Sequence, residues 1–540
     1  MTIRLPFGRS RHGAKTYTAA AAMLLMVSPA LAYNVTISSD PTSNGTLTAS
    51  SFKATGPDAV LNYQDLQNAL AASNFLVKTG TRGSQAGDIT VAHKITWAAN
   101  TLTLDAYHSI VVSKSVLPTS TAGLSFTFRD GGPSDGDLIF SGPGNATFMS
   151  TAQILTINSV PYTLVDGVRT LATDISGNPT GNFALAFSET EPTGFTSTPV
   201  TTTFGGNFEA LGNTISALQI HTSASPTTAM FASLSSIATV KDLTLSGVDI
   251  QSNYSGTADV AALAVSNAGR ISNVVSTGSV QNTSSSASAY VAGLVDFNNS
   301  PGVIVNSHST ATIAATRSFD LGGLVAINSS TLTQDYATGD VSSTVTSATA
   351  GGLVGFNVTA GTVTLCFAKG GLSAPGGVLG GLIGSNEGTI DQAYAVGDLN
   401  SSGGIATAGG LFGTNSGTVT DTYSRGSVVG QNGTTMGGFV GSTTSTSNIA
   451  TSYSTGAPSG GTTIGGFAGS NNSAATSTSL YWNTTTSNVM QATGNGNDTG
   501  ITGLTTGQMR SGLPAGFDSM IWTEQTGVNS GFPYLINLSP

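Results

Sequence analysis

One short phrase recurs through the middle of the chain and restricts what the chain can fold into. The phrase reads GGLVAIN at Gly322, GGLVGFN at Gly351, GGLIGSN at Gly380 and GGLFGTN at Gly409. Altered copies begin at Ala292, Gly437 and Gly465, so successive copies start 30, 29, 29, 29, 28 and 28 residues apart. A period this regular predicts a repeat architecture, in which each unit buries its apolar face against its neighbours.

Three apolar columns run down the repeats. The first lies within the phrase itself, and the second is a β-branched residue or leucine followed by an aromatic ring, as at Val363 and Phe367. The third comes five residues after the ring, as at Leu372. Short apolar columns separated by Gly, Ser, Thr and Asn predict strands with tight corners, and the repeats lack the periodicity of a helix. The predicted fold is all-β, a parallel β-solenoid with end caps and about three short strands per coil of 28–31 residues.

The seventh position of the phrase is an asparagine in all copies but one, which carries Thr443. These residues are Asn298, Asn328, Asn357, Asn386, Asn415 and Asn471. Stacked coils place equivalent residues about 4.8 Å apart, so each side-chain amide can donate to the amide oxygen of the next coil. We predict that the asparagines form a structural ladder at one inward corner, and that the aromatic column stacks inside the solenoid in the same way.

The repeated phrase resembles the GLUG repeat, named for its Gly-Leu-apolar-Gly core, of secreted bacterial proteins of the filamentous-haemagglutinin type. The resemblance covers roughly residues 226 to 485, and the segment from Phe204 to Ile220 resembles the lead-in to such repeats. It implies a right-handed parallel β-helix that is displayed outside the cell and associated with adhesion. No catalytic, cofactor or metal-binding residue is implied by it.

The rest of the chain divides around the repeats. Residues 1–32 have a basic start, an apolar stretch and the sequence Ala30-Leu31-Ala32, which together predict a cleaved secretory signal peptide. Residues 33–225 are predicted to form an N-terminal cap and irregular coils, with a short helix that Asn62 caps. The GLUG-type repeats occupy residues 226–485. Residues 486–540 gather the last bulky apolar side chains and are predicted to cap the C-terminal end.

The charge of the chain and its predicted export restrict which partners it can bind and where it is located. Loss of the signal peptide leaves 13 basic and 27 acidic side chains, with no basic stripe, which disfavours nucleic acid. No apolar run is long enough to span a membrane. The signal peptide predicts passage across the inner membrane, and the cell surface or the medium is favoured over the periplasm. An outer-membrane translocator is possible as a partner, but the repeats are followed by no translocator barrel and Ala32 by no NPNG-type secretion motif.

Several residues carry groups that could support chemistry, but their positions in the sequence favour structural roles. Cys366 is expected to pack within a coil, and His308 is expected to pack in the aromatic column. Asp340 and Asp398 recur at one repeat position but are separated by a coil with Gly371 there, so we expect them at solvated corners. GNGND at Gly494–Asp498 matches part of a calcium-binding nonapeptide, but a single copy is interpreted as a turn. No cofactor is predicted, and no HExxH zinc motif occurs.

The predicted function is that of a non-catalytic, adhesin-like solenoid that contacts cell-surface or host glycans or proteins. The uncharged Thr, Ser and Asn surface favours shallow, multivalent contacts over a deep pocket. The alternatives are a carbohydrate-active β-helix enzyme and a periplasmic or surface scaffold. Convergence of four or more acidic or basic side chains in one groove would favour the enzyme.

Overall fold

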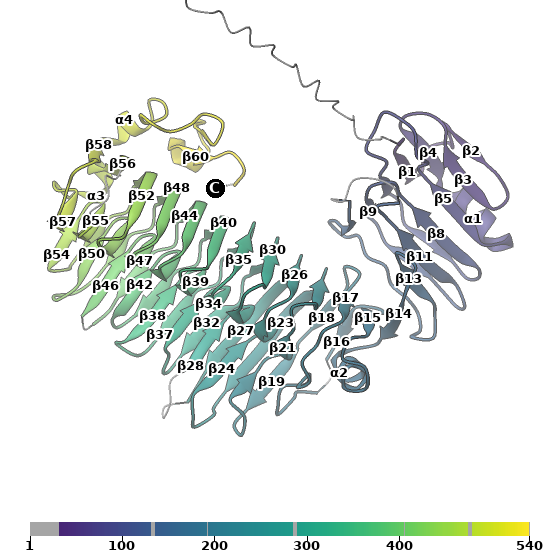
Figure 1. Ribbon diagram of the computed structural model, residues 1–540, viewed down its shortest axis with the longest axis horizontal. Helices are drawn as coiled ribbons and strands as arrows, with labels where there is room; N and C mark the ends of the chain where they lie inside the picture. Colours follow the sequence, from purple (N-terminus) through teal and green to yellow (C-terminus); the bar gives the residue numbers. More distant parts are fainter. Residues whose placement is uncertain are drawn as a thin grey trace, which may run out of the picture.

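The computed structural model describes residues 32–130, 136–191, 193–284, 289–403, 405–473, 478–538 and 540. The predicted signal peptide lies outside these residues, apart from Ala32. The described chain is an all-β parallel solenoid, which confirms the predicted fold class (Figure 1). None of its helices is long and apolar enough to cross a membrane.

Each regular coil contains four short strands. One coil consists of β38 (Ala348–Gly351), β39 (Val354–Asn357), β40 (Thr362–Ala368) and β41 (Leu372–Ala374). The three apolar columns of the sequence mark β39, β40 and β41. β38 ends at the paired glycines, before the first column, so each coil has one strand more than the columns indicate. The glycines are required by close backbone approach, because a Cβ on Gly351 would lie 1.9 Å from the carbonyl oxygen of Val354.

Equivalent strands of successive coils pair in parallel and in register, and so form the long faces of the solenoid. In the described chain a nine-stranded sheet contains β20 (Thr227–Thr228), β24 (Ala258–Ala261), β28 (Ala289–Ala292), β33 (Asp320–Gly322), β38, β42 (Gly377–Gly380), β46 (Ala406–Gly409), β50 (Thr435–Gly437) and β54 (Thr463–Gly465). A ten-stranded sheet contains β21 (Phe231–Leu234), β25 (Ala264–Asn267), β29 (Val295–Asn298), β34 (Val325–Asn328), β39, β43 (Ile383–Asn386), β47 (Phe412–Asn415), β51 (Val440–Thr443), β55 (Ala468–Asn471) and β57 (Thr493–Gly496).

The remaining face carries the residues that matter most for the sites described below. Its strands are β14 (Val160–Val165), β15 (Asn182–Leu185), β16 (Glu189–Thr190), β17 (Asn207–Glu209), β18 (Thr214–Ser216), β19 (Gln219–Thr222), β22 (Thr239–Lys241), β23 (Thr244–Ser252), β26 (Arg270–Ser272), β27 (Val275–Asn282), β30 (Val303–Val305), β31 (His308–Ser309), β32 (Thr312–Ala315), β35 (Thr331–Thr333), β36 (Tyr336–Ala337), β37 (Val341–Ser343), β40, β41, β44 (Thr389–Ala395), β45 (Leu399–Ser401), β48 (Thr418–Ser424), β49 (Val428–Val429), β52 (Asn448–Ser454), β53 (Pro458–Ser459), β56 (Thr478–Asn483) and β58 (Ile501–Leu504).

Residues 32–130 and 136–157 form a smaller stack with its own apolar core, here called the N-terminal section. Its strands are β1 (Val35–Ser38), β2 (Gly45–Leu47), β3 (Ser51–Ala54), β4 (Ala59–Asn62), β5 (Phe75–Lys78), β6 (Ile89–Val91), β7 (Ile95–Trp97), β8 (Thr101–Asp105), β9 (Ile110–Val112), β10 (Val116–Pro118), β11 (Gly123–Thr127), β12 (Leu138–Phe140) and β13 (Leu155–Ile157). The predicted helix is α1 (Tyr63–Ala72), and the Asn62 side chain accepts hydrogen bonds from the backbone of Gln64 and Asp65.

A hairpin joins the N-terminal section to the main solenoid. β13 and β14 pair in antiparallel fashion, and the two turn residues, Asn158 and Ser159, both have positive φ, as a type I′ turn requires. The two apolar cores overlap just after this hairpin, because Leu164, Ala184 and Ala186 still pack with the N-terminal section while Val165 and Phe183 belong to the main solenoid. The two stacks meet at an angle, here called the elbow (Figure 1).

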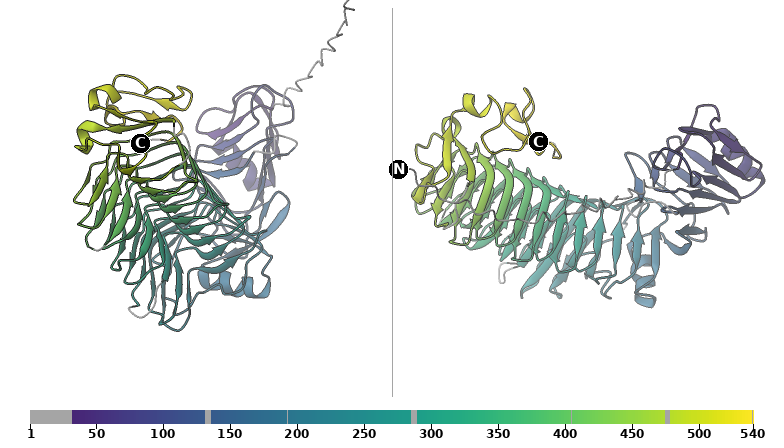
Figure 2. Two further views of the ribbon diagram at one scale, coloured as in Figure 1. Left: turned by 60° about the vertical axis from the view of Figure 1, so that its left-hand side comes forward. Right: turned by 45° about the horizontal axis from the view of Figure 1, so that its top comes forward.

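The C-terminal segment first completes the stack and then turns back over it. α3 (Thr484–Ser487) follows β56, and β57 and β58 pair with the last coil. Beyond them lie α4 (Thr506–Met509), β59 (Trp522–Thr523), the 3₁₀ turn η1 (Asn529–Gly531) and β60 (Tyr534–Leu535). Figures 1 and 2 show this segment, residues 505–538 and here called the cap, on the same side of the solenoid as the N-terminal section.

Candidate functional site

The asparagines of the repeated phrase are buried and hydrogen-bonded from coil to coil. Each side-chain nitrogen donates to the side-chain oxygen of the next asparagine, at 2.8 Å from Asn298 to Asn328, 2.8 Å from Asn328 to Asn357, 2.8 Å from Asn357 to Asn386 and 2.7 Å from Asn386 to Asn415. The ladder starts one coil earlier than the sequence columns indicate, because Asn267 donates to Asn298 at 2.9 Å. Asn267 ends the irregular phrase AALAVSN, at the same seventh position as the other asparagines. That position could have identified it as a ladder residue from the sequence.

Hydroxyl groups replace the amide where the ladder lapses at Thr443. Asn415 donates to Ser447 Oγ at 2.6 Å, and Thr443 Oγ1 donates to Asn471 Oδ1 at 2.7 Å. Asn471 in turn donates to the backbone oxygen of Asn497 at 2.6 Å. Asn471 is therefore not hydrogen-bonded directly to the other five asparagines. On the side of Thr443 it accepts a hydrogen bond from the threonine hydroxyl instead.

The aromatic rings form a continuous stack, but on the outside of the solenoid. The outer aromatic column consists of His308, Tyr336, Phe367, Tyr394, Tyr423, Tyr453 and Tyr481. Centroids of successive rings from His308 to Tyr453 lie 4.2, 4.6, 4.9, 4.8 and 5.2 Å apart, and the planes are within 9° of parallel. The prediction that this column lies inside was wrong. In β44, Ala393 and Ala395 point into the main core while Tyr394, between them, points outward.

A left-handed backbone residue sits two positions before each ring. Among those residues are Asn306 before His308 and Gln334 before Tyr336, with φ values of 52° and 59°. Such a residue kinks the strand and resets which side chains face outward. Because the strand does not alternate through this point, the sequence pattern alone placed the rings on the wrong side.

The cap covers only the C-terminal part of the outer aromatic column. Tyr394, Tyr423 and Tyr453 are 0% exposed, and they share an apolar cluster with Trp522 and other cap residues. The Trp522 indole nitrogen donates to Asp421 Oδ1 at 2.7 Å. Tyr453 and Tyr481 donate to cap carbonyl oxygens at 2.6 and 2.8 Å, and Arg425 donates to the side chain of Ser530 at 3.0 Å. Polar and apolar contacts together hold the cap in one position.

The rings nearest the N-terminal section remain open to solvent on one side. His308, Tyr336 and Phe367 are half-buried, and His308 and Tyr336 line a groove of about 300 Å³. The other wall of the groove is backbone of the N-terminal section at Gly142 and Gly144. Burial lowers the pKa of His308, which favours a neutral ring.

Polar side chains form a second row along the same groove. Asn273 donates to Asp242 Oδ1 at 2.8 Å, and Asn306 donates to Asn273 Oδ1 at 2.5 Å. These side chains lie beside the rings of His308 and Tyr336 and offer both amide donors and oxygen acceptors. The groove therefore combines the exposed edges of aromatic rings with amide and carboxyl groups, an arrangement typical of small-molecule sites.

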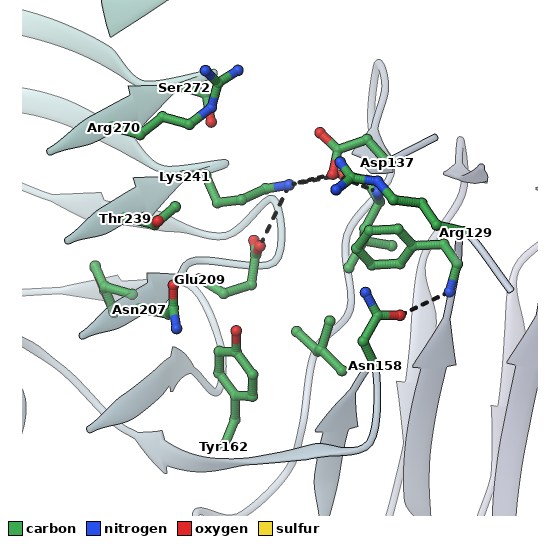
Figure 3. A pocket seen from close by; sticks show the side chains of 14 residues that line it. Arg129, Asp137, Asn158, Tyr162, Asn207, Glu209, Thr239, Lys241, Arg270 and Ser272 are labelled. Carbon is green, nitrogen blue, oxygen red and sulfur yellow. Dashed lines mark hydrogen bonds and ion pairs between the residues drawn. The ribbon is translucent and has the colours of Figure 1, made fainter. Parts of the chain in front are cut away.

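A larger cavity of about 470 Å³ lies in the elbow (Figure 3). The main solenoid supplies Glu209 from β17, Lys241 from β22 and Arg270 from β26. The N-terminal section supplies Arg129 and Asp137 from the loop and strand around β12. Five acidic or basic side chains thus converge in one cavity. Sequence reasoning missed the cavity, since its walls come from coils up to about 140 residues apart that only the hairpin brings together.

An ion-pair network crosses the elbow at Lys241. Its ammonium group lies 3.0 Å from Asp137 Oδ1, 3.4 Å from Asp242 Oδ2 and 3.9 Å from Glu209 Oε2. Burial alone would lower the pKa of Lys241, but these carboxylates raise it. Burial raises the pKa of Glu209 well above its ordinary value, and burial followed by the Glu209 charge raises the pKa of Tyr162 to about 12.

The remaining groups that the sequence singled out take structural positions. Asp340 and Asp398 are exposed at corners, where each accepts a backbone N–H from the next coil, from Gly371 and Ser427 respectively, at 2.8 Å. Cys366 is buried, and burial raises the pKa of its thiol. Within the described residues no three His, Cys, Asp or Glu side chains are arranged to hold a metal ion, and the GNGND segment forms the end of β57 and the turn after it.

Comparison with known proteins adds little to this geometry. No protein-family model matches the sequence, and no curated protein matches it. One solved structure that matches is described as a putative immunoglobulin A1 protease from Bacteroides ovatus. It is 14% identical, covers 70% of this chain and 93% of its own, and has a TM-score of 0.30. A TM-score this low supports no inference about function, so the sites rest on their own residues.

Proposed function

We propose that this protein is a non-catalytic, surface-displayed or secreted binding protein that holds glycans on the open part of its outer aromatic column. The observation that carries the proposal is the row of half-buried rings at His308, Tyr336 and Phe367, flanked by the amides of Asn273 and Asn306. Stacking covers the faces of these rings, so the C–H groups of a sugar would pack against their exposed apolar edges, while its hydroxyls take up the amide donors and acceptors.

The length of the solenoid suits contacts with an extended chain. Successive rings are 4.2 and 4.6 Å apart from His308 to Phe367, so a glycan can cross several coils along one line. Individual contacts of this kind are weak, and binding strength comes from their number or from several copies of the protein. The resemblance of the repeats to the GLUG repeats of filamentous-haemagglutinin-type adhesins supports the same assignment and display outside the cell.

The test is glycan binding by the chain that begins at Tyr33. A glycan array identifies the best binder, and calorimetry then measures its Kd for wild type and for the double variant Tyr336→Ala/Phe367→Ala. We expect the double variant to bind at least 10-fold more weakly, which corresponds to about 1.4 kcal/mol.

Phe319→Ala is the matched control, because Phe319 is an aromatic side chain that is 46% exposed but lies outside the column. Its affinity should equal that of wild type. Equal losses in Phe319→Ala and in the double variant, or no binding to any glycan on the array, would contradict the proposal. Cell fractionation tests location separately, and recovery in the periplasm alone would favour a scaffold over an adhesin.

A second candidate function is a carbohydrate-active enzyme, and the elbow cavity is the observation in its favour. Five acidic or basic side chains line it, which meets the condition set by the sequence for an enzyme. Glu209 would be the proton donor, because burial favours its protonated form. Release of reducing ends or unsaturated products from a polysaccharide panel, abolished by Glu209→Gln, would establish this function in place of the first.

A further inference from the structure

Three of the chain's few basic side chains line the elbow cavity, where Asp137 and Glu209 also lie. After residue 32 the sequence has 13 basic and 27 acidic side chains, yet Arg129, Lys241 and Arg270 all line this one cavity. The three come from different parts of the fold, Arg129 from the N-terminal section and the other two from neighbouring coils. Figure 3 shows Lys241 reaching toward Asp137 across the cavity, with Arg129 on the far wall and Arg270 one coil above.

The lysine is already paired, whereas the two arginines are not. Lys241 is bound by Asp137, and Asp242 and Glu209 lie within 4 Å of it. No ion pair is found between a described residue and either Arg129 or Arg270. The only hydrogen bond found for the Arg129 side chain is from Nε to the backbone oxygen of Gly136, so its terminal nitrogens are available. A guanidinium group presents donors in a planar fork that matches a carboxylate.

The rest of the lining offers neutral hydrogen-bonding groups. These are Asn158, Tyr162, Asn207, Thr239 and Ser272. Thr239 and Arg270 are paired in register on adjacent strands, and Asn207 is paired with Thr239, so the three form one outward column. A ligand held by Arg270 would therefore have hydroxyl and amide partners along its length. The cavity volume of about 470 Å³ lies within the range of small-molecule sites.

We propose that the elbow cavity binds a sugar acid, with its carboxylate held between Arg129 and Arg270 and its hydroxyls facing the neutral lining. The ligand is either a free sugar acid or the acidic terminal residue of a glycan, since both present the same carboxylate and hydroxyls. This site is separate from the groove of the outer aromatic column and does not depend on glycan binding there. It also requires no chemistry at Glu209.

The experiment measures binding of glucuronate and of glucose to the full chain from Tyr33 by calorimetry. Glucose has the same ring and hydroxyls but no carboxylate, so the difference isolates the charge. We expect glucuronate to bind at least 10-fold more tightly than glucose, and to lose at least 10-fold in 0.5 M salt because ions screen the attraction. A glucuronate oligomer with an acidic terminal residue is the third ligand, and it distinguishes a glycan terminus from a free acid.

Arg129→Gln and Arg270→Gln should each weaken glucuronate binding at least 10-fold. The matched control is Arg317→Gln, since Arg317 is also exposed and also has no ion pair among the described residues. Melting curves establish that each variant is folded, and the double variant Tyr336→Ala/Phe367→Ala should bind glucuronate like wild type. The proposal is overturned if glucuronate binds no more tightly than glucose, or if Arg317→Gln loses as much affinity as the other two.

Discussion

The inside and the outside of the same coils are organised by different means. Inside, the amides of Asn298 to Asn415 are bonded to one another, and each new coil supplies the partner that the previous one lacks. Outside, the rings of the outer aromatic column stack with the same period, but their free edges face solvent unless something covers them. The cap covers Tyr394, Tyr423 and Tyr453 and leaves His308 to Phe367 open.

This difference shows what a repeat can and cannot provide by itself. A ladder of amides is satisfied by translation alone, because every donor meets an identical acceptor one coil away. A stack of rings on the outer face is not satisfied by translation alone, because translation buries the ring faces and leaves the apolar ring edges in water. The covered part is thus a structural core built on the outer face, and the open part is the surface that we assign to a ligand.

The largest effect is expected where the cap seals the outer stack. Trp522 is fully buried against Tyr423 and Tyr453, so Trp522→Ala should cost about 3–5 kcal/mol of cap docking. Tyr336→Ala in the open part loses two stacking contacts and should cost only about 1–2 kcal/mol. Hydrogen exchange across residues 505–538 and denaturant unfolding measure both. Equal costs would mean that the cap does not distinguish the two parts of the column.

The inner ladder gives a comparison with a smaller expected loss of stability, between two variants of the same residue type. Asn386→Ala leaves the oxygen of Asn415 without its ladder partner, at about 1–3 kcal/mol, while the nitrogen of Asn357 keeps its hydrogen bond to the backbone oxygen of Gly361. Asn471→Ala should cost less, since the Thr443 hydroxyl can rotate to another acceptor and Asn497, whose backbone oxygen loses the Asn471 donor, is an exposed residue. Denaturant unfolding of the two variants tests this. Two shifts near zero would show that these amides are not buried in solution.

The smallest expected effect has the opposite sign and comes from a place where the repeat is broken. Asp296 stands where other copies of the phrase have Ala326 or Gly355, and both its carboxylate oxygens are buried without a hydrogen-bond partner. Burial, together with Asp259 and Asp320, raises the pKa of Asp296 well above its ordinary value. Asp296→Ala should therefore stabilise the protein at pH 7, by about 1–2 kcal/mol.

The pH dependence of that gain follows from the raised pKa. The folded chain keeps the Asp296 proton while the unfolded chain loses it above about pH 4, so wild type loses stability as pH rises from there toward the folded-state pKa. The advantage of Asp296→Ala should be greatest near neutral pH and should shrink as pH falls to 4. Unfolding curves at pH 4, 5.5 and 7 measure it. An advantage that does not change with pH would mean that Asp296 is not held protonated.

Elements with a local pattern were predictable, and elements that depend on a distant surface were not. The helix at α1 follows from Asn62 and the spacing of Leu66 and Leu70, and strands such as β8 and β11 follow from apolar alternation, as at Leu102 and Leu104. α2 (Val168–Gly177) was missed although Val168, Leu171 and Ile175 have helical spacing, because it lies among irregular coils without a side-chain cap. The elbow cavity left no local pattern at all, since Arg129 and Arg270 line one cavity only because of the bend at Asn158 and Ser159.

The sequence by itself determined the solenoid, its period, the ladder from Asn298 to Asn415 and the stacking of the rings. All of these follow from repetition, because a residue that recurs once per coil must lie beside its own copies. Only the tertiary structure decided that the rings face outward, that the cap covers some of them, and that the elbow gathers charges from both stacks. Those outcomes depend on left-handed corner residues, on a segment that folds back across several coils, and on one hairpin. The left-handed corner recurs in every coil, but it is occupied by Asn, Gln, Leu, Asp, Thr or Ser, so it leaves no column of one residue type in the sequence. The cap segment and the hairpin each occur once and leave no column at all.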